Sequence, residues 1–252
     1  MKPPPLIGVV ERRLLVNYRT DPQITARLLP PPLRPQLVNG YAVAGICLIR
    51  LGQLRPRHTP RALGLRSENA AHRIAVEWNT PDGVATGVYI PRRDTDSTIN
   101  VLVGGRLFPG QHHRARFDVH ETAQDLRVAF ASTDHTTAVH THARIRGDWT
   151  ATTLFANLHE ASDFFRQGAA GYSARRDGRC LDGLELQTAA WQIEPAEILT
   201  ARSTFFDDTT RFPRGSATLD GALLMRGIPV TWNPLTPMAT GINTDLLEAS
   251  AQ

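Results

Sequence analysis

The stretch LLVNYRTDP, Leu14 to Pro22, decides how the chain begins to fold. Its first half alternates around Val16 and Tyr18, which predicts a β-strand with one buried face. Asp21 is a favoured N-cap residue, and the proline after it suits the first helical position, so the strand is expected to lead into a short helix. Pro30 ends that helix, because proline cannot continue it. The fold is therefore predicted to start with a strand followed at once by a short helix.

Strand signals dominate the rest of the chain. Asn39-Gly40 between two apolar runs predicts a tight hairpin. Further strands are expected at residues 74–78, 84–91, 115–120, 126–132, 136–145, 184–193, 198–206 and 223–228. Apolar residues at helical spacing, with Gly168 as a stop, predict one clear helix over Leu154 to Gln167. These elements predict an α+β class, mostly antiparallel β with a few short helices, in one barrel-like sheet.

One segment before the middle of the chain fits two structures. Asp94 or Asp96 is a suitable cap for a short helix that runs through Val103. Ile99 and Val101 also alternate with polar residues, as they would in a strand. Both interpretations are open at this point.

Length and composition favour one large domain. The 252 residues are 41% hydrophobic, enough for a sizeable core, and no linker divides them. We expect a single domain over residues 1–252, with its core at about 12–233 and a frayed tail after about 237. The longest apolar run, Tyr41 to Ile49, is far too short to span a membrane, and the N-terminus does not resemble a signal peptide. A cytoplasmic protein that binds no membrane is therefore expected.

The cysteines and the charged residues exclude several classes of function. Cys47 and Cys180 have no metal-ligand spacing and are predicted to be reduced, buried thiols. The net charge of +4 is not clustered, since basic residues alternate with acids, so no nucleic-acid partner is expected. Lys2 is the sole lysine among the 28 basic residues, which leaves one amine side chain for Schiff-base chemistry. No cofactor motif occurs, and no cofactor is expected.

Gly104 to Arg114 is the stretch richest in groups that can do chemistry. It holds two adjacent histidines, two arginines, and a Pro-Gly turn. On a strand, His112 and His113 would point to opposite faces, so at most one of them needs to face a cavity. Imidazole titrates near neutrality and suits acid–base catalysis.

Several phrases resemble a known family in order along the chain. The strand and turn at Val16–Asp21, and the helix that ends at Leu28–Leu33, resemble the N-terminal part of acetoacetate decarboxylases. The whole chain is still more similar to an uncharacterised branch of that superfamily, the YqjF-like domain of unknown function. The phrases that carry this likeness are Arg66–Asn69, Tyr89–Asp94 and Gly105–Gly110. The resemblance covers roughly Leu14 to Trp232.

The resemblance implies a closed, cone-like β-barrel with an internal cavity, in a homo-oligomer. In the decarboxylases a lysine in that cavity forms a Schiff base with a β-keto acid, beside a second lysine and a glutamate. The lysine pair falls on His112-His113 in this chain, and the glutamate falls on Glu68. Imidazole cannot form the imine, so decarboxylation by this mechanism is excluded unless Lys2 reaches the cavity.

The candidate site combines acid–base residues with residues that bind anions. The catalytic candidates are Glu68, His113 and His112, and the substrate-binding candidates are Arg106, Arg92, Arg93, Arg19 and Tyr89. Arginine binds carboxylates with two parallel N–H donors. The alternatives are a salt bridge for Glu68, surface ion pairs for the arginines, and a packing role for Tyr89. His140 and His142 lie on one strand face and, together with His112, His113 or His135, could build a metal site. Two histidines at this spacing are a weak signal, so a solvated face is expected and no metal is assigned.

These residues predict a protein that binds a small anionic organic molecule, a carboxylate or keto acid, inside a barrel. Lyase, isomerase or cyclase chemistry by acid–base catalysis would suit the site. The alternative is a non-catalytic binding or structural protein of the same fold. Glu68 within hydrogen-bond reach of a histidine in the cavity favours the enzyme, whereas Glu68 paired outward to an arginine favours the alternative.

Overall fold

The computed structural model describes residues 4–102 and 108–241, and strands make up most of them. The strands are β1 (Leu6–Thr20), β2 (Arg34–Pro35), β3 (Leu37–Val38), β4 (Tyr41–Pro56), β5 (Leu65–Thr80), β6 (Gly83–Thr95), β7 (His112–Glu121), β8 (Asp125–Ser132), β9 (Ala138–Ile145), β10 (Ala170–Ala174), β11 (Cys180–Gln187), β12 (Glu194–Ser203), β13 (Ala217–Pro234) and β14 (Met238–Ala239). The helices are α1 (Pro22–Ala26), the short 3₁₀ turn η1 (Arg61–Leu63), α2 (Thr98–Leu102) and α3 (Leu158–Gln167). The prediction of a mostly-β fold with few helices is confirmed.

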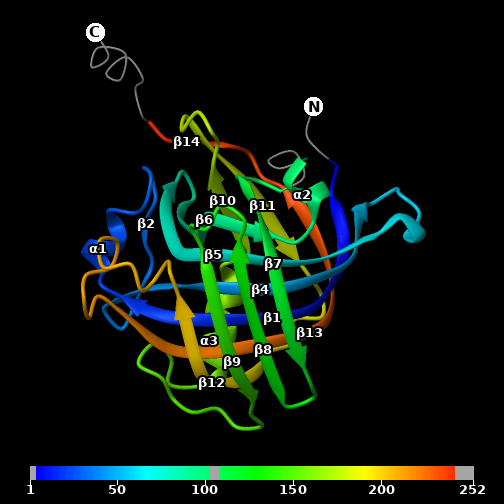
Figure 1. The fold of residues 1–252 in the computed structure, drawn as a ribbon. Helices are drawn as coiled ribbons and strands as arrows, with labels where there is room; N and C mark the ends of the chain where they lie inside the picture. Colours follow the sequence, from blue (N-terminus) through cyan, green and yellow to red (C-terminus); the bar gives the residue numbers. More distant parts are fainter. Residues whose placement is uncertain (1–3, 103–107, 242–252) are drawn as a thin grey trace.

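The strands form one sheet whose order is β14-β11-β10-β6-β7-β8-β9-β12-β13-β1-β4-β5-β2. β5 also pairs with β6, so the pairings from β6 through β13 and β1 to β5 return to their starting strand. Most neighbours are antiparallel, but β6 is parallel to β7 and to β10. In Figure 1, β7, β8 and β9 run steeply in front of the more level β1, β4 and β13.

Local signals at the start of the chain behave as predicted. The carboxylate of Asp21 accepts hydrogen bonds from the backbone N–H groups of Gln23 and Ile24, at 2.8 and 2.9 Å, and caps α1. Asn39 and Gly40 have φ angles of 50° and 83°, as the hairpin turn between β3 and β4 requires. Both features depend on residues within four positions of each other, which is why the sequence predicts them.

Other boundaries differ from the prediction. The ambiguous segment after β6 is helical at Thr98–Leu102, and the rest of it, from Val103, lies outside the described residues. β11 ends at Gln187, so the strand predicted at 184–193 is displaced toward the N-terminus. β5 continues through the polar segment 66–73, because polar residues there have partners on both faces of the sheet.

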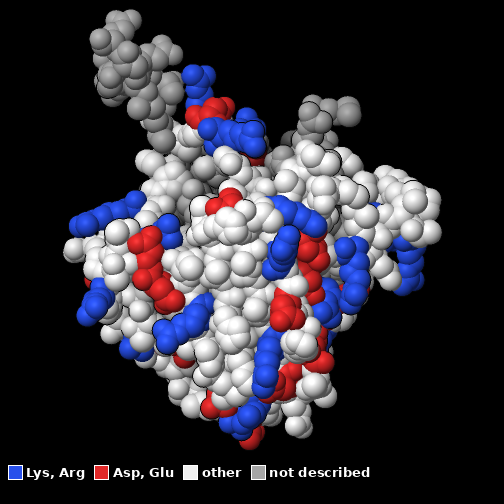
Figure 2. All heavy atoms as spheres, viewed as in Figure 1, with Lys and Arg blue, Asp and Glu red and all other residues white. Residues whose placement is uncertain are grey.

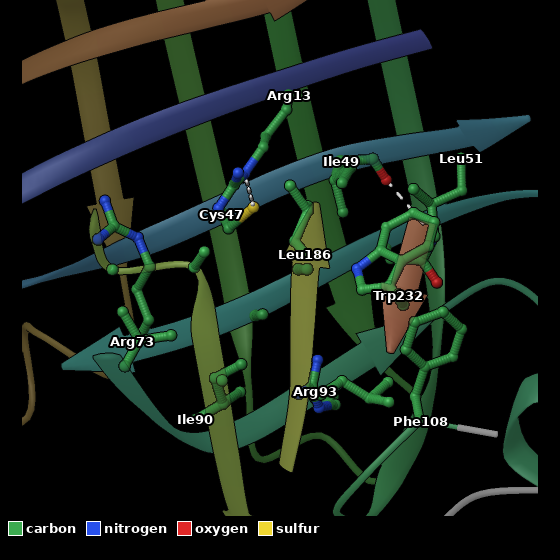
Figure 3. A pocket seen from close by; sticks show the side chains of 18 of the residues that line it. Arg13, Cys47, Ile49, Leu51, Arg73, Ile90, Arg93, Phe108, Leu186 and Trp232 are labelled. Carbon is green, nitrogen blue, oxygen red and sulfur yellow. Dashed lines mark hydrogen bonds between the residues drawn. The ribbon is translucent and has the colours of Figure 1, made fainter. Parts of the chain in front are cut away.

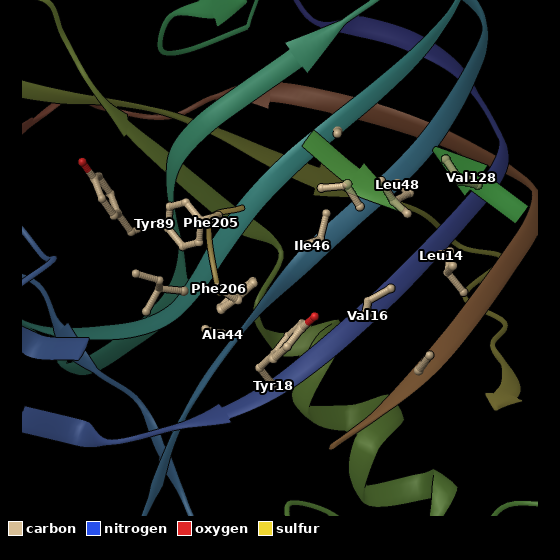
Figure 4. Close-up of a cluster of buried hydrophobic side chains, with 14 of the residues drawn as sticks. Leu14, Val16, Tyr18, Ala44, Ile46, Leu48, Tyr89, Val128, Phe205 and Phe206 are labelled. Carbon is tan, nitrogen blue, oxygen red and sulfur yellow. The ribbon is translucent and has the colours of Figure 1, made fainter. Parts of the chain in front are cut away.

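The main core lies between β1, β4 and β5 on one side and β7, β8 and β9 on the other. Figure 4 shows Leu14, Val16, Ile46, Leu48 and Val128 in this cluster. Neighbouring residues on a strand point to opposite faces of the sheet. The residues that alternate with these core residues therefore point to the second face of β1, β4 and β5. On that second face, β1, β4 and β5 pack against α3. The two faces of these strands therefore have different neighbours, and the candidate site belongs to the second face.

No helix among the described residues has the length and apolar composition that crossing a membrane requires.

Candidate functional site

A cavity of about 130 Å³ lies on the second face of β4 and β5. Its wall also contains residues of β1, β6, β7, β10, β11, β13, α2 and α3. Figure 3 shows the apolar side chains of this wall, which include Ile49, Leu51, Phe108, Leu186 and Trp232. The polar side chains are mainly arginine, asparagine, histidine and cysteine. The cavity is therefore an apolar chamber with a basic polar part.

Three arginines from three different strands line the cavity: Arg13 on β1, Arg73 on β5 and Arg93 on β6. Within residues 4–102 and 108–241, none of the three forms an ion pair with an acidic side chain. The carboxylate of Asp94, also in the wall, is bound by Arg92 at 2.8 Å. The positive charge of the cavity is thus left without an acidic counterpart in this part of the chain.

The contacts of two of these arginines are with uncharged groups. Arg73 is 3% exposed, donates to the side-chain oxygen of Asn17, and lies over the ring of Phe165 at 4.7 Å. Arg13 donates from Nε to Cys47 Sγ at 3.2 Å. These contacts orient the guanidinium groups and leave their charge uncompensated.

The third arginine, Arg93, makes no side-chain hydrogen bond to any described residue, and its buried Nε has no partner. The Nε atom of Arg73 is likewise buried without a partner. Burial lowers the pKa of both groups to about 10, and for Arg73 the charge of Arg13 adds to this effect. Both remain charged at neutral pH, although an unpaired buried charge is costly. An anion with two adjacent oxygens would satisfy such donors in a bidentate manner.

The two adjacent histidines point to opposite faces, as predicted. β7 runs parallel to β6, with His112 beside Arg93 and His113 beside Asp94. His112 lines the cavity, and its buried Nδ1 has no hydrogen-bond partner among the described residues. Burial, followed by the charge of Arg93, lowers the pKa of His112 to about 3, so it is neutral at physiological pH. His113 instead lies 2.9 Å from Asp134 through Nδ1, outside the cavity wall.

Glu68 lies on the opposite face of β5 from the cavity, while its neighbour Asn69 lines it. Its carboxylate binds Arg12 at 2.5 Å and Arg50 at 2.6 Å. Glu121 on β7 joins the same two arginines, at 3.4 and 3.2 Å. The structure therefore places Glu68 in an ion-pair network, as the salt-bridge alternative predicts, and does not bring it together with His112.

The remaining candidates are scattered. Arg92 binds Asp94 and Asp134, at 2.8 and 3.1 Å, and is itself absent from the cavity wall. Arg19 lies 3.7 Å from Asp220 and is absent from the cavity wall. Tyr89 is buried in the main core between two residues that do face the cavity. Arg106 and Lys2 lie outside the described residues. Among the predicted site residues, the structure thus brings Arg93 and His112 together in one cavity.

No metal centre is assembled among the described residues, since no three His, Cys, Asp or Glu side chains converge there. His142 binds Asp125 at 2.8 Å, and His140 is exposed.

Arg13, Arg73 and Cys47 are the wall residues that sequence reasoning missed. Part of the signal is in the sequence: Arg73 ends a polar segment and directly precedes the apolar run 74–76, and a charged residue beside such a run needs a reason. Period-two alternation also places Cys47 on the same face as Ile49 and Leu51. Alternation does not say which face meets a cavity, and so these residues could not be selected from the sequence.

Two histidines are expected to weaken the fold in mild acid. His72 is fully buried, and burial, followed by the charges of Arg92 and Arg211, lowers its pKa to about 3. The folded pKa values of His72 and His112 lie below the ordinary value of 6.5, so the unfolded chain holds more protons between about 6.5 and 3. Acidification through this window therefore lowers the free energy of unfolding, by up to about 1.4 kcal/mol per pH unit for each histidine.

Urea unfolding at a series of pH values from 7.5 to 5 measures this slope, in a range above the ordinary titration of carboxylates. His72→Gln should remove about half of the slope. His159→Gln is the matched control, since His159 lies on the surface with 84% of its side chain exposed. An unchanged slope in His72→Gln would show that His72 does not act in this way.

Comparisons with known proteins concern the family and the fold of the chain. The sequence profile of DUF2071, described as an uncharacterized conserved protein family, matches residues 10–225. Among curated proteins, none matches the chain.

Several solved structures share the fold. An acetoacetate decarboxylase-like enzyme from Sphingomonas wittichii RW1 is 14% identical, with a TM-score of 0.61 over 95% of this chain and 94% of that one. The acetoacetate decarboxylase from Legionella pneumophila is 10% identical, with a TM-score of 0.57 over 93% and 88%. The enduracididine biosynthesis enzyme MppR, solved with pyruvate, is 12% identical, with a TM-score of 0.58 over 96% and 92%. At these identities the likeness establishes the fold, which is that of acetoacetate decarboxylase.

Proposed function

The chain belongs to the DUF2071 family of uncharacterised conserved proteins, and we propose that it binds a small organic anion, a carboxylate or keto acid, in the cavity. The observation that carries the proposal is the set of three arginines, Arg13, Arg73 and Arg93, in one wall without acidic partners among the described residues. Natural proteins pair or neutralise buried charge, so a cavity of this kind needs an anion from outside.

The size and the apolar wall of the cavity limit the ligand. A volume of about 130 Å³ accommodates about four water molecules or an organic molecule of roughly six non-hydrogen atoms. Phe108 and Trp232, whose rings lie 5.6 Å apart, offer apolar surface for a short carbon chain. A protein of the same fold, MppR, has been solved in complex with pyruvate, which is of this size and charge. Short monocarboxylates of about six non-hydrogen atoms are therefore the proposed ligand class.

Isothermal titration of the protein with pyruvate, and with pyruvamide as the matched neutral ligand, tests the proposal. Pyruvate should bind at least about tenfold more tightly, because only the carboxylate pairs with guanidinium groups. The difference in affinity between pyruvate and pyruvamide should decrease little as the salt concentration rises, since salt screens buried ion pairs poorly. Equal affinities for the acid and its amide, or no binding of either, would rule the proposal out.

Acid–base catalysis is the second candidate, and His112 is the observation that favours it. His112 is the one predicted catalytic residue in the wall, neutral and with a free ring nitrogen among the described contacts. Lyase, isomerase or cyclase chemistry would therefore depend on His112, while Glu68 stays in its ion pairs. Pairing of Glu68 away from the cavity favours the non-catalytic alternative, in which the protein only binds its ligand.

Deuterium exchange separates these alternatives. If His112 moves protons, NMR in D₂O should show exchange at the methyl carbon of bound pyruvate that is lost in His112→Gln, while binding persists. Binding without exchange would favour a binding protein.

Four features implied by the sequence remain predictions: a single domain, a closed cone-like barrel, a homo-oligomer and a cytoplasmic location. A nucleic-acid partner is not part of the proposal. On the face that Figure 2 shows, arginines alternate with acidic side chains and form no continuous basic surface.

A further inference from the structure

We infer that Cys47 is a nucleophile of this cavity, and that the anion it meets carries an electrophilic carbon, such as the carbonyl of a 2-oxo acid. The inference rests on the proposed function, because the arginines must first hold the anion. It adds a covalent step to that function and narrows the ligand class from carboxylates in general to those with a reactive carbonyl.

The position of Cys47 in the wall is the first observation. Cys47 lies on β4, is 6% exposed, and shares the wall with Arg13, Arg73 and Arg93. Arg13 Nε donates to its sulfur at 3.2 Å, the contact marked by a dashed line in Figure 3. A buried structural cysteine packs as a small apolar residue. This sulfur instead has a fixed positive charge where a thiolate, the nucleophilic form, would carry its negative charge.

The second observation points independently to a ligand beside Cys47. Arg73 is 3% exposed, lines the cavity, and has a buried Nε without a partner among the described residues. Cys47, Arg73 and Arg93 all line this one cavity. The sulfur therefore shares the cavity with two groups that would hold the carboxylate of a ligand.

Neighbouring strands leave room for a ligand at the sulfur. Cys47 is flanked across the sheet by Leu15 on β1 and by Ala71 on β5. Ala71 also lines the cavity, and its methyl group is small.

The chemical step is an addition that balances without a further reactant. The sulfur attacks the carbonyl carbon of the 2-oxo acid, a carbon–sulfur bond forms, and the carbonyl π bond breaks. The thiol proton ends on the former carbonyl oxygen, and the product is a hemithioketal. No group is oxidised or reduced, and the reverse step restores the thiol and the keto acid.

Alkylation with a charged and an uncharged reagent of equal shape tests the inference. The background is Cys180→Ala, because Cys180 is the one other cysteine of the chain and is half-buried away from this wall. Iodoacetate should then alkylate Cys47 at least about tenfold faster than iodoacetamide does, since the guanidinium groups of the wall attract and bind the carboxylate of iodoacetate. In this reaction the sulfur displaces iodide, and the thiol proton passes to water. Peptide mass spectrometry over time gives both rates.

Three controls make the result specific. Pyruvate should slow the reaction with iodoacetate by occupying the cavity. Arg93→Met should bring the iodoacetate rate down to that of iodoacetamide, whereas Arg34→Met should not, because Arg34 is paired with Glu77 and neither residue lines the wall. Cys47→Ser in the same background should give no adduct.

The failure of this inference is distinguishable from the failure of the proposed function. If pyruvate binds in the titration but Cys47 reacts no faster with iodoacetate than with iodoacetamide, the nucleophile is wrong and anion binding stands. If pyruvate does not bind and neither reagent is favoured, both are wrong. Preferential alkylation that pyruvate and Arg93→Met both suppress supports the inference.

Discussion

Replacing Arg93 with methionine is expected to stabilise the protein and to weaken its anion binding. Arg93 is a half-buried cation whose buried Nε has no described partner, so the folded state bears the desolvation cost of the charge without a compensating ion pair. Methionine fills a similar volume without that cost, and the free energy of unfolding should rise by roughly 1–3 kcal/mol. The loss of a charge-assisted hydrogen bond should weaken pyruvate binding by about 10- to 100-fold.

Thermal unfolding and isothermal titration measure the two effects, which have opposite signs. For a chain of this size, each kcal/mol moves the melting temperature by about 2–4 °C. Arg92→Met is the matched control, since Arg92 is the adjacent arginine and binds Asp94, whose side chain is fully buried. It should lose stability, because it leaves that carboxylate without its partner. If Arg93→Met unfolds more easily than the parent protein and binds pyruvate with normal affinity, Arg93 has a structural role and does not bind the anion.

Replacing Glu68 with glutamine is expected to destabilise the fold strongly and to leave anion binding intact. Glu68 neutralises Arg12, which is 1% exposed, and also binds Arg50. Removing one partner of a buried ion pair costs about 3–5 kcal/mol, and the remaining contact of Arg12 with Glu121 should hold the loss near the lower value. Urea unfolding gives this loss, and titration of the folded variant with pyruvate gives the affinity.

Glu77→Gln is the control for Glu68→Gln. Glu77 also lies on β5 and pairs with Arg34 on the neighbouring strand β2, but both side chains are partly exposed, at 30% and 43%. Its removal should cost less than about 1 kcal/mol. If Glu68→Gln instead keeps full stability and loses pyruvate binding or turnover, Glu68 belongs to the active site.

Local structure was the part of the fold most open to prediction. The cap at Asp21 and the turn at Asn39-Gly40 depend on groups within four residues, and the structure confirms both. The opposed faces of His112 and His113 follow from the geometry of any strand. The mostly-β class follows from the same alternation, repeated along the chain.

The candidate site was predicted only in part. Arg93 and His112 do line the cavity, but the partner of Glu68 was beyond prediction from spacing, since Arg12 lies 56 residues away in the chain. The sequence does not single out Arg73, because its neighbours form a polar segment. The sequence predicts only a buried packing thiol at Cys47, because its contact with Arg13 joins β4 to β1 and depends on strand pairing.

Residue order alone thus establishes which side chains share a strand face, where the chain turns, and that the chain has a single lysine, Lys2, for imine chemistry. These properties depend on covalent geometry and on short-range hydrogen bonds. The pairing of strands far apart in the chain decides which face lines the cavity. The same pairing brings Arg13, Arg73, Arg93 and Cys47 together in the cavity wall. The stretch from Leu14 to Pro22 shows the division: its own residues specify a strand and a cap, while the packing of β1 beside β4 and β13 places Arg13, the residue just before it, in the cavity wall.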